Sequence, residues 1–154
     1  MAHLHWITKE FDELNNRQLY QLLALRSTVF VLEQTCLYQD MDNKDQHCHH
    51  VMGIDSESGA LAAYARIVPP GISFPELSIG RIITAPEYRG KGLGVQLMNR
   101  SIELCSELYS PQNIRIGAQA HLQKFYQSFG FVSEGEVYDE DGIDHMEMVL
   151  PASL

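Results

Sequence analysis

The sequence predicts one α/β (α+β) domain in which helices flank a mixed central sheet of about six to seven strands. Its 154 residues suffice for one core, because a chain of this length buries roughly 70% of the surface that it exposes when unfolded. The periodic patterns follow the order α, β, β, β, α, β, α, β, β. Turn signals pair the strands near both ends, and helices separate the strands in the middle. A single domain over residues 1–154 follows.

The first half of the chain contains one helical pattern and two strand patterns. Apolar residues recur at helical spacing from Asn15 to about Val31, with Asn15 or Asn16 able to cap the helix, and no element is predicted before Asn15. The segment that follows, "TCLYQDMDNKDQHCHH", is polar and rich in turn formers, which predicts a loop. The turn "SESG" then separates two β-patterned runs, 49–55 and 60–68, and predicts a hairpin.

The second half alternates strands with helices and ends in another hairpin. Prolines in "PPGISFPE" interrupt the pattern before a β-branched run, and Gly130 stands where a helix C-cap is expected. The turn "DEDG" separates the last two strand patterns. In chain order, the patterns predict a strand over 77–85, a helix over 92–108 with Leu93, Leu97, Met98, Ile102 and Cys105 on its core face, a strand over 113–120, a short helix over 121–130, and strands over 131–138 and 143–150.

The charge balance points away from nucleic acid as a partner. The formal net charge is −9, whereas binding to a phosphate backbone requires a basic surface. Seven carboxylates and no Lys or Arg lie between Ser133 and Met148. Such a surface attracts a cationic small molecule or peptide, although an acidic hairpin that only aids solubility has the same composition.

Cysteine usage and hydropathy predict a cytoplasmic protein that does not enter a membrane. The three cysteines are odd in number, and the first residues lack the apolar core of a secretory signal. No apolar run approaches the roughly 20 residues that a bilayer-spanning helix needs. A homodimer is the default expectation, because two-fold dimers are the commonest oligomers.

A glycine-rich loop, "YRGKGLG", stands between a predicted strand and a predicted helix. Backbone N–H groups at a helix N-terminus bind anions, and glycine lets a ligand approach them closely. The loop lacks the GxxxxGK string of a Walker A motif, and it is not the GxGxxG fingerprint of a dinucleotide fold. A plain turn remains the structural alternative.

The string Arg89-Gly90-Lys91-Gly92-Leu93-Gly94 resembles the acyl-CoA pyrophosphate loop of the GNAT N-acetyltransferase superfamily. The segment "GAQAHLQKFYQSFGF" is similar to a second GNAT signature, in which a strand leads into a helix that carries a Tyr four residues before Gly-Phe. Together with "LRSTVFVLEQTCLYQDMDNKD" and "VYDEDGIDHMEM", these segments resemble the ElaA-like group of that superfamily over residues 6–149. The resemblance implies the GNAT fold and acetyl-CoA as co-substrate.

The resemblance assigns a donor site by position. In GNAT enzymes the backbone of the loop holds the pyrophosphate of CoA, and the strand before the loop pairs with the pantetheine arm through its backbone. Where many members have Asn seven residues before the Tyr, this chain has Gln119, which is longer but can still bind the pantetheine amides. The implied donor residues are Ile82, Ile83, Thr84, Arg89, Gly90, Lys91, Gly92, Leu93, Gly94 and Gln119.

Tyr126 matches the family residue that protonates the leaving thiolate. Tyrosine is protonated at neutral pH, and general acid catalysis contributes a factor of typically 10² to 10⁴. The alternative is a tyrosine that only packs the helix against the sheet. For the general base, alternation in "IDHMEMV" places His145 and Glu147 on one strand face, and Glu147 is the candidate to bind or deprotonate the amine. His50, His121 and a chain of waters remain alternatives.

The acceptor side is predicted less sharply. Arg26 and Arg66 are cations within apolar runs, so each needs a carboxylate partner, and Arg26 can serve either such an ion pair or the substrate. The histidines and Cys48 in "DQHCHH" invite a metal site, but neighbouring strand residues point to opposite faces, so no metal is expected. The candidate acceptor-side residues are Arg26, Glu33, Gln34, His50 and His145.

Three functions fit these observations. The leading hypothesis is an N-acetyltransferase that transfers the acetyl group of acetyl-CoA to a primary amine by direct attack in a ternary complex, and the acidic hairpin favours a cationic amine. The alternative is a GNAT-fold module that binds or senses acyl-CoA without catalysis. The third is a metal-binding protein built on "HCHH".

Overall fold

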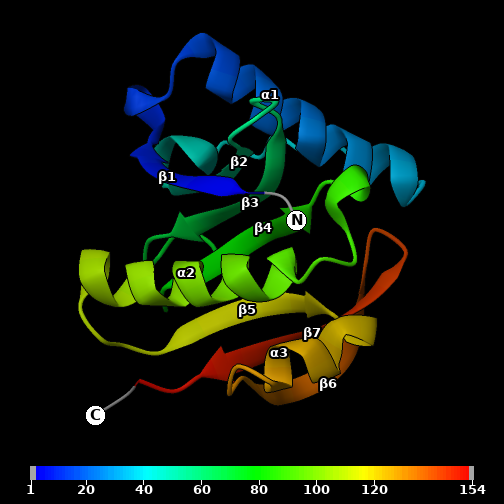
Figure 1. The fold of residues 1–154 in the computed structure, drawn as a ribbon. Coiled ribbons are helices and arrows are strands. Elements are labelled where there is room, and N and C mark those ends of the chain that lie inside the picture. Colours follow the sequence, from blue (N-terminus) through cyan, green and yellow to red (C-terminus); the bar gives the residue numbers. More distant parts are fainter. Residues whose placement is uncertain (1–2, 153–154) are drawn as a thin grey trace.

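In the computed structural model, which describes residues 3–152, seven strands form two antiparallel sheets (Figure 1). The first sheet has the order β1-β2-β3-β4, and the second has the order β5-β7-β6. The predicted α/β class is confirmed, with the strands divided between two sheets instead of forming one. The strands are β1 (Leu4–Glu10), β2 (His49–Asp55), β3 (Leu61–Val68), β4 (Ser78–Thr84), β5 (Ile114–Gln119), β6 (Val132–Glu140) and β7 (Ile143–Leu150).

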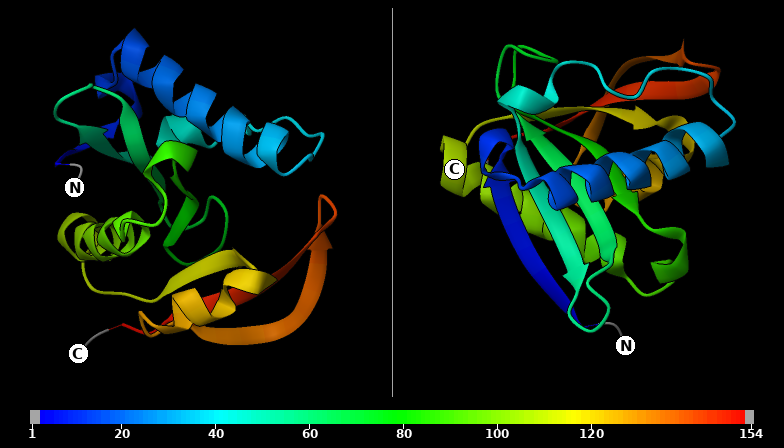
Figure 2. Two further views of the ribbon diagram at one scale, coloured as in Figure 1. Left: turned by 45° about the vertical axis from the view of Figure 1, so that its right-hand side comes forward. Right: turned by 90° about the horizontal axis from the view of Figure 1, so that it is seen from above.

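Two long helices, α1 (Asn16–Arg26) and α2 (Leu93–Tyr109), cover opposite faces of the first sheet, and the short α3 (Gln123–Gln127) lies beside the second sheet (Figure 2). Asn15 caps α1 as predicted, because its Oδ1 accepts the Gln18 N–H at 2.8 Å. π-helical turns, η2 (Ser27–Glu33), continue α1 past the predicted end. Short 3-10 turns complete the order: η1 (Phe11–Glu13), η3 (Asp45–His47), η4 (Pro86–Tyr88) and η5 (Ala120–Leu122).

The core lies on both faces of the first sheet. Every residue of β3 is buried, and its alternate side chains meet α1 on one face and α2 on the other. The predicted core face of α2 is confirmed, since its apolar stripe packs against both sheets. Tyr64 of β3 packs with Leu22 and Val29 in a buried apolar cluster, here called the α1 cluster. This cluster holds the helix that leads into η2 against the sheet.

The strand β1 is absent from the predicted elements. It pairs with β2 along its whole length, from Leu4 opposite Asp55 to Glu10 opposite His49. Its polar residues sit on an edge strand, where half of the positions face water, so the apolar pattern is weak. Trp6 packs against the main core from this strand.

We expect Gly53→Ala to lower the free energy of unfolding by about 1–3 kcal/mol, because a Cβ at Gly53 would overpack the core. That atom would lie 2.8 Å from Cζ3 of Trp6. Urea denaturation followed by circular dichroism measures the effect. The matched control is Gly80→Ala, whose Cβ would meet its nearest neighbour at 3.9 Å. Equal unfolding midpoints for the two variants would contradict the packing argument.

The two sheets meet at one point and then separate. Leu77 forms a parallel bridge with Ile114, and the Arg115 N–H donates to the Leu77 carbonyl at 2.9 Å. Beyond this point β4 bends at a bulge, where its register against β3 shifts and Arg81 adopts a φ of 50°. The strands β4 and β5 therefore diverge, and a cavity opens between them.

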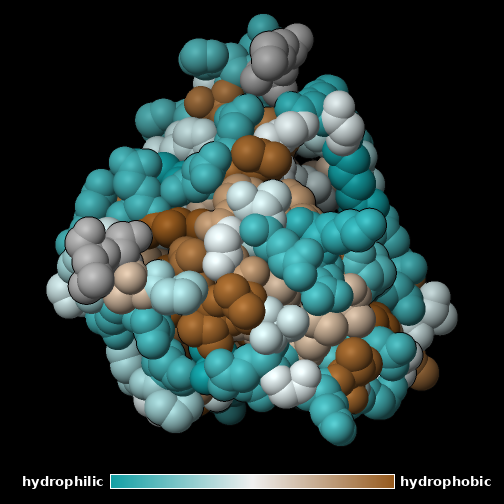
Figure 3. Space-filling view, turned by 90° about the horizontal axis from the view of Figure 1, so that it is seen from below, coloured by the Kyte–Doolittle hydropathy of each residue, from teal (hydrophilic) through white to brown (hydrophobic). Residues whose placement is uncertain are grey.

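The surface of the second sheet is mixed in character. Its lower face shows brown apolar areas enclosed by teal hydrophilic surface (Figure 3). Val132 and Val137 on β6 are the exposed large apolar side chains of this sheet. Between residues 3 and 152 no helix is both long enough and apolar enough to cross a membrane. The predicted homodimer stays a prediction.

Candidate functional site

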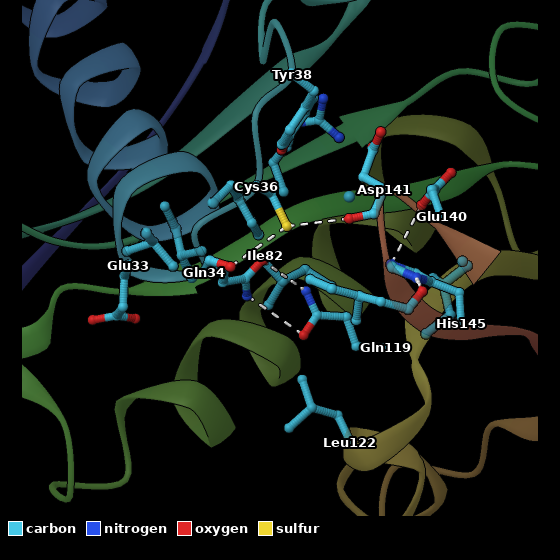
Figure 4. A pocket seen from close by; sticks show the side chains of 18 of the residues that line it. Glu33, Gln34, Cys36, Tyr38, Ile82, Gln119, Leu122, Glu140, Asp141 and His145 are labelled. Carbon is cyan, nitrogen blue, oxygen red and sulfur yellow. Dashed lines mark hydrogen bonds and ion pairs between the residues drawn. The ribbon is translucent and has the colours of Figure 1, made fainter.

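The gap between β4 and β5 forms a cavity of about 620 Å³. Its walls come from η2, the loop after η2, β4, the glycine-rich loop, β5, α3 and the tip of the β6–β7 hairpin. Figure 4 shows this arrangement: Glu33 and Gln34 approach from η2, Gln119 from β5, and Glu140, Asp141 and His145 from the hairpin. One continuous space thus runs from Arg89 to the acidic hairpin, and the predicted loop residues 90–94 do not line it.

The glycine-rich loop leaves the N-terminus of α2 open. Gly90 and Gly92 have φ values of 78° and 75°, and nothing lies within 4 Å of a Cβ placed on either residue. Gly92 is the N-cap of the 17-residue helix α2, so the first N–H groups of the helix face outward. Arg89 lines the cavity and forms a bidentate ion pair with Glu33 of η2, at 2.6 and 3.0 Å.

The strand β4 turns a free backbone edge toward the cavity. It pairs with β3 on one side only, and Ile82, Ile83 and Thr84 all line the space on the other side. The Ile83 side chain is buried in the α1 cluster, so its contribution to the cavity is largely main chain. Unpaired N–H and C=O groups on a sheet edge are ready to pair with an extended ligand.

Tyr126 lies on α3 at the junction of core and cavity. Its ring packs edge-on against Phe125 and Phe131, with centroid distances of 5.2 and 6.1 Å, and only 6% of its surface is exposed. Burial raises the pKa of Tyr126 to about 12. The side chain therefore packs the helix, and Tyr126 is also one of the residues that line the cavity.

Gln119 and Gln34 face each other across the cavity. Their amides exchange two hydrogen bonds, of 3.3 and 3.5 Å, which join β5 to η2 (Figure 4). The structure brings both predicted residues to the same place. Both amides carry donors and acceptors that can instead bind a ligand's amides.

The predicted shared face of His145 and Glu147 is confirmed, but only His145 reaches the cavity. Its Nδ1 lies 2.8 Å from the Ile143 carbonyl, and its Nε2 lies 3.3 Å from Glu140. Glu147 lines an adjoining hollow of about 390 Å³, where Arg115 Nη1 binds it at 2.9 Å. The ion pair therefore keeps the Glu147 carboxylate out of the cavity.

Arg26 and Arg66 have the carboxylate partners that were predicted, and with Arg81 they form a closed ring, here called the Arg–Asp ring. The ring lies beside the cavity and ties α1, β3 and the β4 bulge to the loop after η2. Its contacts are Arg26–Asp40 at 2.7 Å, Asp40–Arg81 at 2.8 Å, Arg81–Asp42 at 3.5 Å, Asp42–Arg66 at 2.6 Å, Arg66–Asp45 at 2.8 Å and Asp45–Arg26 at 2.7 Å.

Contact of Arg26 or His50 with substrate is not supported, because both side chains are fully buried and neither lines the cavity. Arg26 is bound within the Arg–Asp ring. His50 Nε2 donates to the Asp45 carbonyl at 2.9 Å, which leaves Nδ1 to accept the Tyr64 hydroxyl at 2.6 Å. Burial lowers the pKa of His50, so its imidazole is neutral near pH 7. Both residues hold the walls of the site in place.

The segment "DQHCHH" does not converge on one point. The Cys48 thiol donates to the Lys44 carbonyl at 3.2 Å, and His49 approaches the Tyr109 hydroxyl at 3.3 Å. Across residues 3–152, no group of three or more His, Cys, Asp or Glu side chains is arranged to hold a metal ion.

Several cavity residues were not among the predicted site residues. Cys36 and Tyr38 come from the turn-rich segment after η2, and the Cys36 thiol donates to the Asp141 carbonyl at 3.3 Å, which joins this loop to the hairpin tip (Figure 4). The carboxylates of the hairpin were noted as a charge, but their approach to this loop depends on tertiary packing. No local sequence pattern predicts this approach of the hairpin to the loop.

A family profile for the acetyltransferase (GNAT) domain matches residues 14–152. The chain belongs to the GNAT acetyltransferase family. Protein ElaA of Escherichia coli is 44% identical to it over 147 residues, which cover 94% of this chain and 95% of that protein. A UPF0039 protein of Synechocystis is 38% identical over 146 residues, with 95% and 94% covered. The predicted resemblance to GNAT proteins of the ElaA-like group is confirmed.

Solved structures agree with the GNAT fold. An acyl-CoA N-acyltransferase from Pseudomonas aeruginosa superposes with a TM-score of 0.90 at 40% identity, covering 96% of this chain and 99% of that one. Escherichia coli ElaA gives 0.88 at 42% identity, with the same coverage. A CoA-dependent acyl-homoserine lactone synthase, BjaI, gives 0.77 at 18% identity, which shows a shared fold alone. The two matches at 40% and 42% identity thus agree with membership of the GNAT family.

Proposed function

We propose that this GNAT protein is an N-acetyltransferase that moves the acetyl group of acetyl-CoA to a primary amine by direct attack in a ternary complex. The observation that carries the proposal is the continuity of the cavity. Arg89 of the glycine-rich loop, the free edge of β4 and Tyr126 lie along one side, and the acidic hairpin tip closes the other. Donor and acceptor can therefore meet without a covalent enzyme intermediate.

The donor fits the open side of the cavity. The pyrophosphate rests on N–H groups of residues 89–94, where the helix dipole and the Lys91 ammonium favour an anion, whereas Arg89 is already paired with Glu33. Lys91 remains near this position, with its Nζ 5.4 Å from the Tyr88 ring centre. The pantetheine amides pair with the backbone of Ile82, Ile83 and Thr84 and with the Gln119 amide. A backbone N–H at the β4 bulge polarises the thioester carbonyl.

The transfer step needs one base and one acid. The neutral amine attacks the thioester carbon, the C–N bond forms, and negative charge builds on the carbonyl oxygen. The C–S bond then breaks, and the Tyr126 hydroxyl gives its proton to the leaving sulfur. The proton released by the amine leaves through water past His145 and Glu140, since the Arg115 ion pair holds Glu147 away from the cavity. The products are an N-acetyl amine and CoA.

A screen of primary amines with acetyl-CoA tests the proposal. We expect release of free CoA thiol that depends on the amine, together with an acetylated product of matching amount in mass spectrometry. Longer acyl-CoA donors in the same assay establish the acyl group. Reactions without amine provide the control for thioester hydrolysis. Tight CoA binding with no thiol released for any amine would favour the alternative, a module that senses acyl-CoA without catalysis.

A further inference from the structure

The cations at the cavity and the adjoining hollow are matched by carboxylates, with one exception. Arg66 and Arg81 belong to the Arg–Asp ring, and Arg89 is paired with Glu33. Lys44 lines both spaces, yet within residues 3–152 it has no carboxylate at ion-pair distance. Its Nζ contacts only the neutral Ser73 hydroxyl, at 3.1 Å. An ammonium in this position has charge to offer to a ligand.

The backbone around Lys44 is fixed. Asn43 adopts a φ of 62°, and the Lys44 N–H donates to Asp42 Oδ1 at 3.1 Å. Asp42 is itself bound by two arginines of the Arg–Asp ring. Ser73 is held in a turn in which the Gly71 N–H donates to the Phe74 carbonyl at 2.7 Å. Lys44 is thus anchored from both directions, unlike an ordinary surface lysine.

Negative charge remains at the tip of the β6–β7 hairpin. Asp141 lines the cavity, and its carboxylate forms no ion pair with any cation between residues 3 and 152. Glu140, which lines both spaces, faces His145 Nε2 at 3.3 Å. The acceptor end therefore presents the Lys44 ammonium and two carboxylates, Asp141 without an ion pair among the described residues and Glu140 beside a histidine.

We propose that the acceptor is a small amino acid or a close derivative, an amine that carries a carboxylate on the same molecule. This inference rests on the proposed N-acetyltransferase function. The carboxylate binds the Lys44 ammonium and the Ser73 hydroxyl, and the amine approaches Asp141 and Glu140. A charge-assisted hydrogen bond is about twice as strong as a neutral one, so Lys44 selects for the anion. A diamine would place a second cation against Lys44 and is disfavoured.

Matched pairs of acceptors that differ only by the carboxylate test this inference. Suitable pairs are ornithine and putrescine, lysine and cadaverine, tyrosine and tyramine, and histidine and histamine. For the pair with the highest activity, we expect kcat/KM to favour the amino acid by about tenfold or more, as for sites built around a polar group of the substrate. In Lys44→Met the preference falls to near unity, and Lys44→Arg retains most of it.

Lys9→Met is the matched control, because Lys9 is also half-buried and bonded to one neutral group, Gln18, but lies outside the cavity. It should leave the preference unchanged. Calorimetry on protein saturated with CoA measures the affinity for both members of each pair. These affinities separate the proposed N-acetyltransferase function from the proposed acceptor site. A carboxylate preference in binding that depends on Lys44, without any turnover, would overturn catalysis but support the site. Equal binding and turnover of both members would overturn the inference.

Discussion

Tyr126→Phe lowers kcat by about tenfold or more while affinity for CoA is retained, if the hydroxyl protonates the leaving thiolate. The ring packs against Phe125 and Phe131, and phenylalanine preserves this packing. The substitution therefore removes only the O–H group. Steady-state turnover with a saturating amine measures the effect, and calorimetry with CoA checks the affinity.

The pH dependence gives an independent signature of Tyr126. Burial raises its pKa to about 12, so the hydroxyl keeps its proton as pH rises through 10. We therefore expect that ionisation of Tyr126 causes no decrease in kcat as the pH is raised to 10. Tyr109→Phe, which removes a hydroxyl near His49 outside the cavity, serves as the control and should leave turnover unchanged. Full turnover in Tyr126→Phe would exclude the acid role and leave the family assignment intact.

Asp45→Asn lowers the free energy of unfolding by about 3–5 kcal/mol, the usual cost of leaving a buried charge without its partner. Asp45 is only 6% exposed, and one of its oxygens accepts Arg26 and Arg66, at 2.7 and 2.8 Å. The asparagine leaves two buried guanidinium groups short of one negative charge. Urea denaturation followed by circular dichroism measures the change.

The control for the Arg–Asp ring is Glu33→Gln, which breaks the ion pair between Glu33 and Arg89. Both partners are more than one third exposed, so we expect a cost of about 1 kcal/mol or less. Comparable losses in Asp45→Asn and Glu33→Gln would contradict the assignment of the ring as a buried structural unit.

Acid should weaken the same ring. Burial alone would raise the pKa of Asp45, but hydrogen bonds and charge from Arg26 and Arg66 outweigh it and hold the pKa below its ordinary value. A lowered carboxyl pKa contributes stability above the unfolded value of about 4 and loses it as pH falls below that. The urea concentration at the unfolding midpoint should therefore decrease as the pH is lowered below about 4. The decrease should be less steep in Asp45→Asn.

The glycine-rich loop and the Tyr126 helix were predictable because their signals are local. Gly90 and Gly92 indicate a turn immediately before a helix. The Tyr126 helix is recognised by a Tyr four residues before Gly-Phe. The need of Arg26 for a carboxylate also followed from a cation in an apolar run. Its actual partners come from a polar loop that shows only turn chemistry in the sequence.

The cavity wall formed by the loop after η2 and the β6–β7 hairpin was not predictable, because its residues meet only through tertiary packing. Glu147 and His145 share a strand face, as alternation requires, yet Arg115 draws Glu147 into the adjoining hollow. Lys44 and Asp141 are almost 100 positions apart in the chain. The edge strand β1 was missed for a different reason, since the polar residues of a strand that is half exposed dilute its apolar alternation.

The divergence of β4 from β5 has a consequence for how this protein can change in evolution. The wall along β4 includes main-chain atoms of an unpaired strand edge, and substitutions at the partly buried positions Ile82 and Thr84 leave these atoms in place. The opposite wall consists of side chains from a loop and a hairpin tip, such as Tyr38 and Asp141. Single substitutions in that opposite wall can therefore change the shape and charge of the cavity while the main-chain wall stays the same.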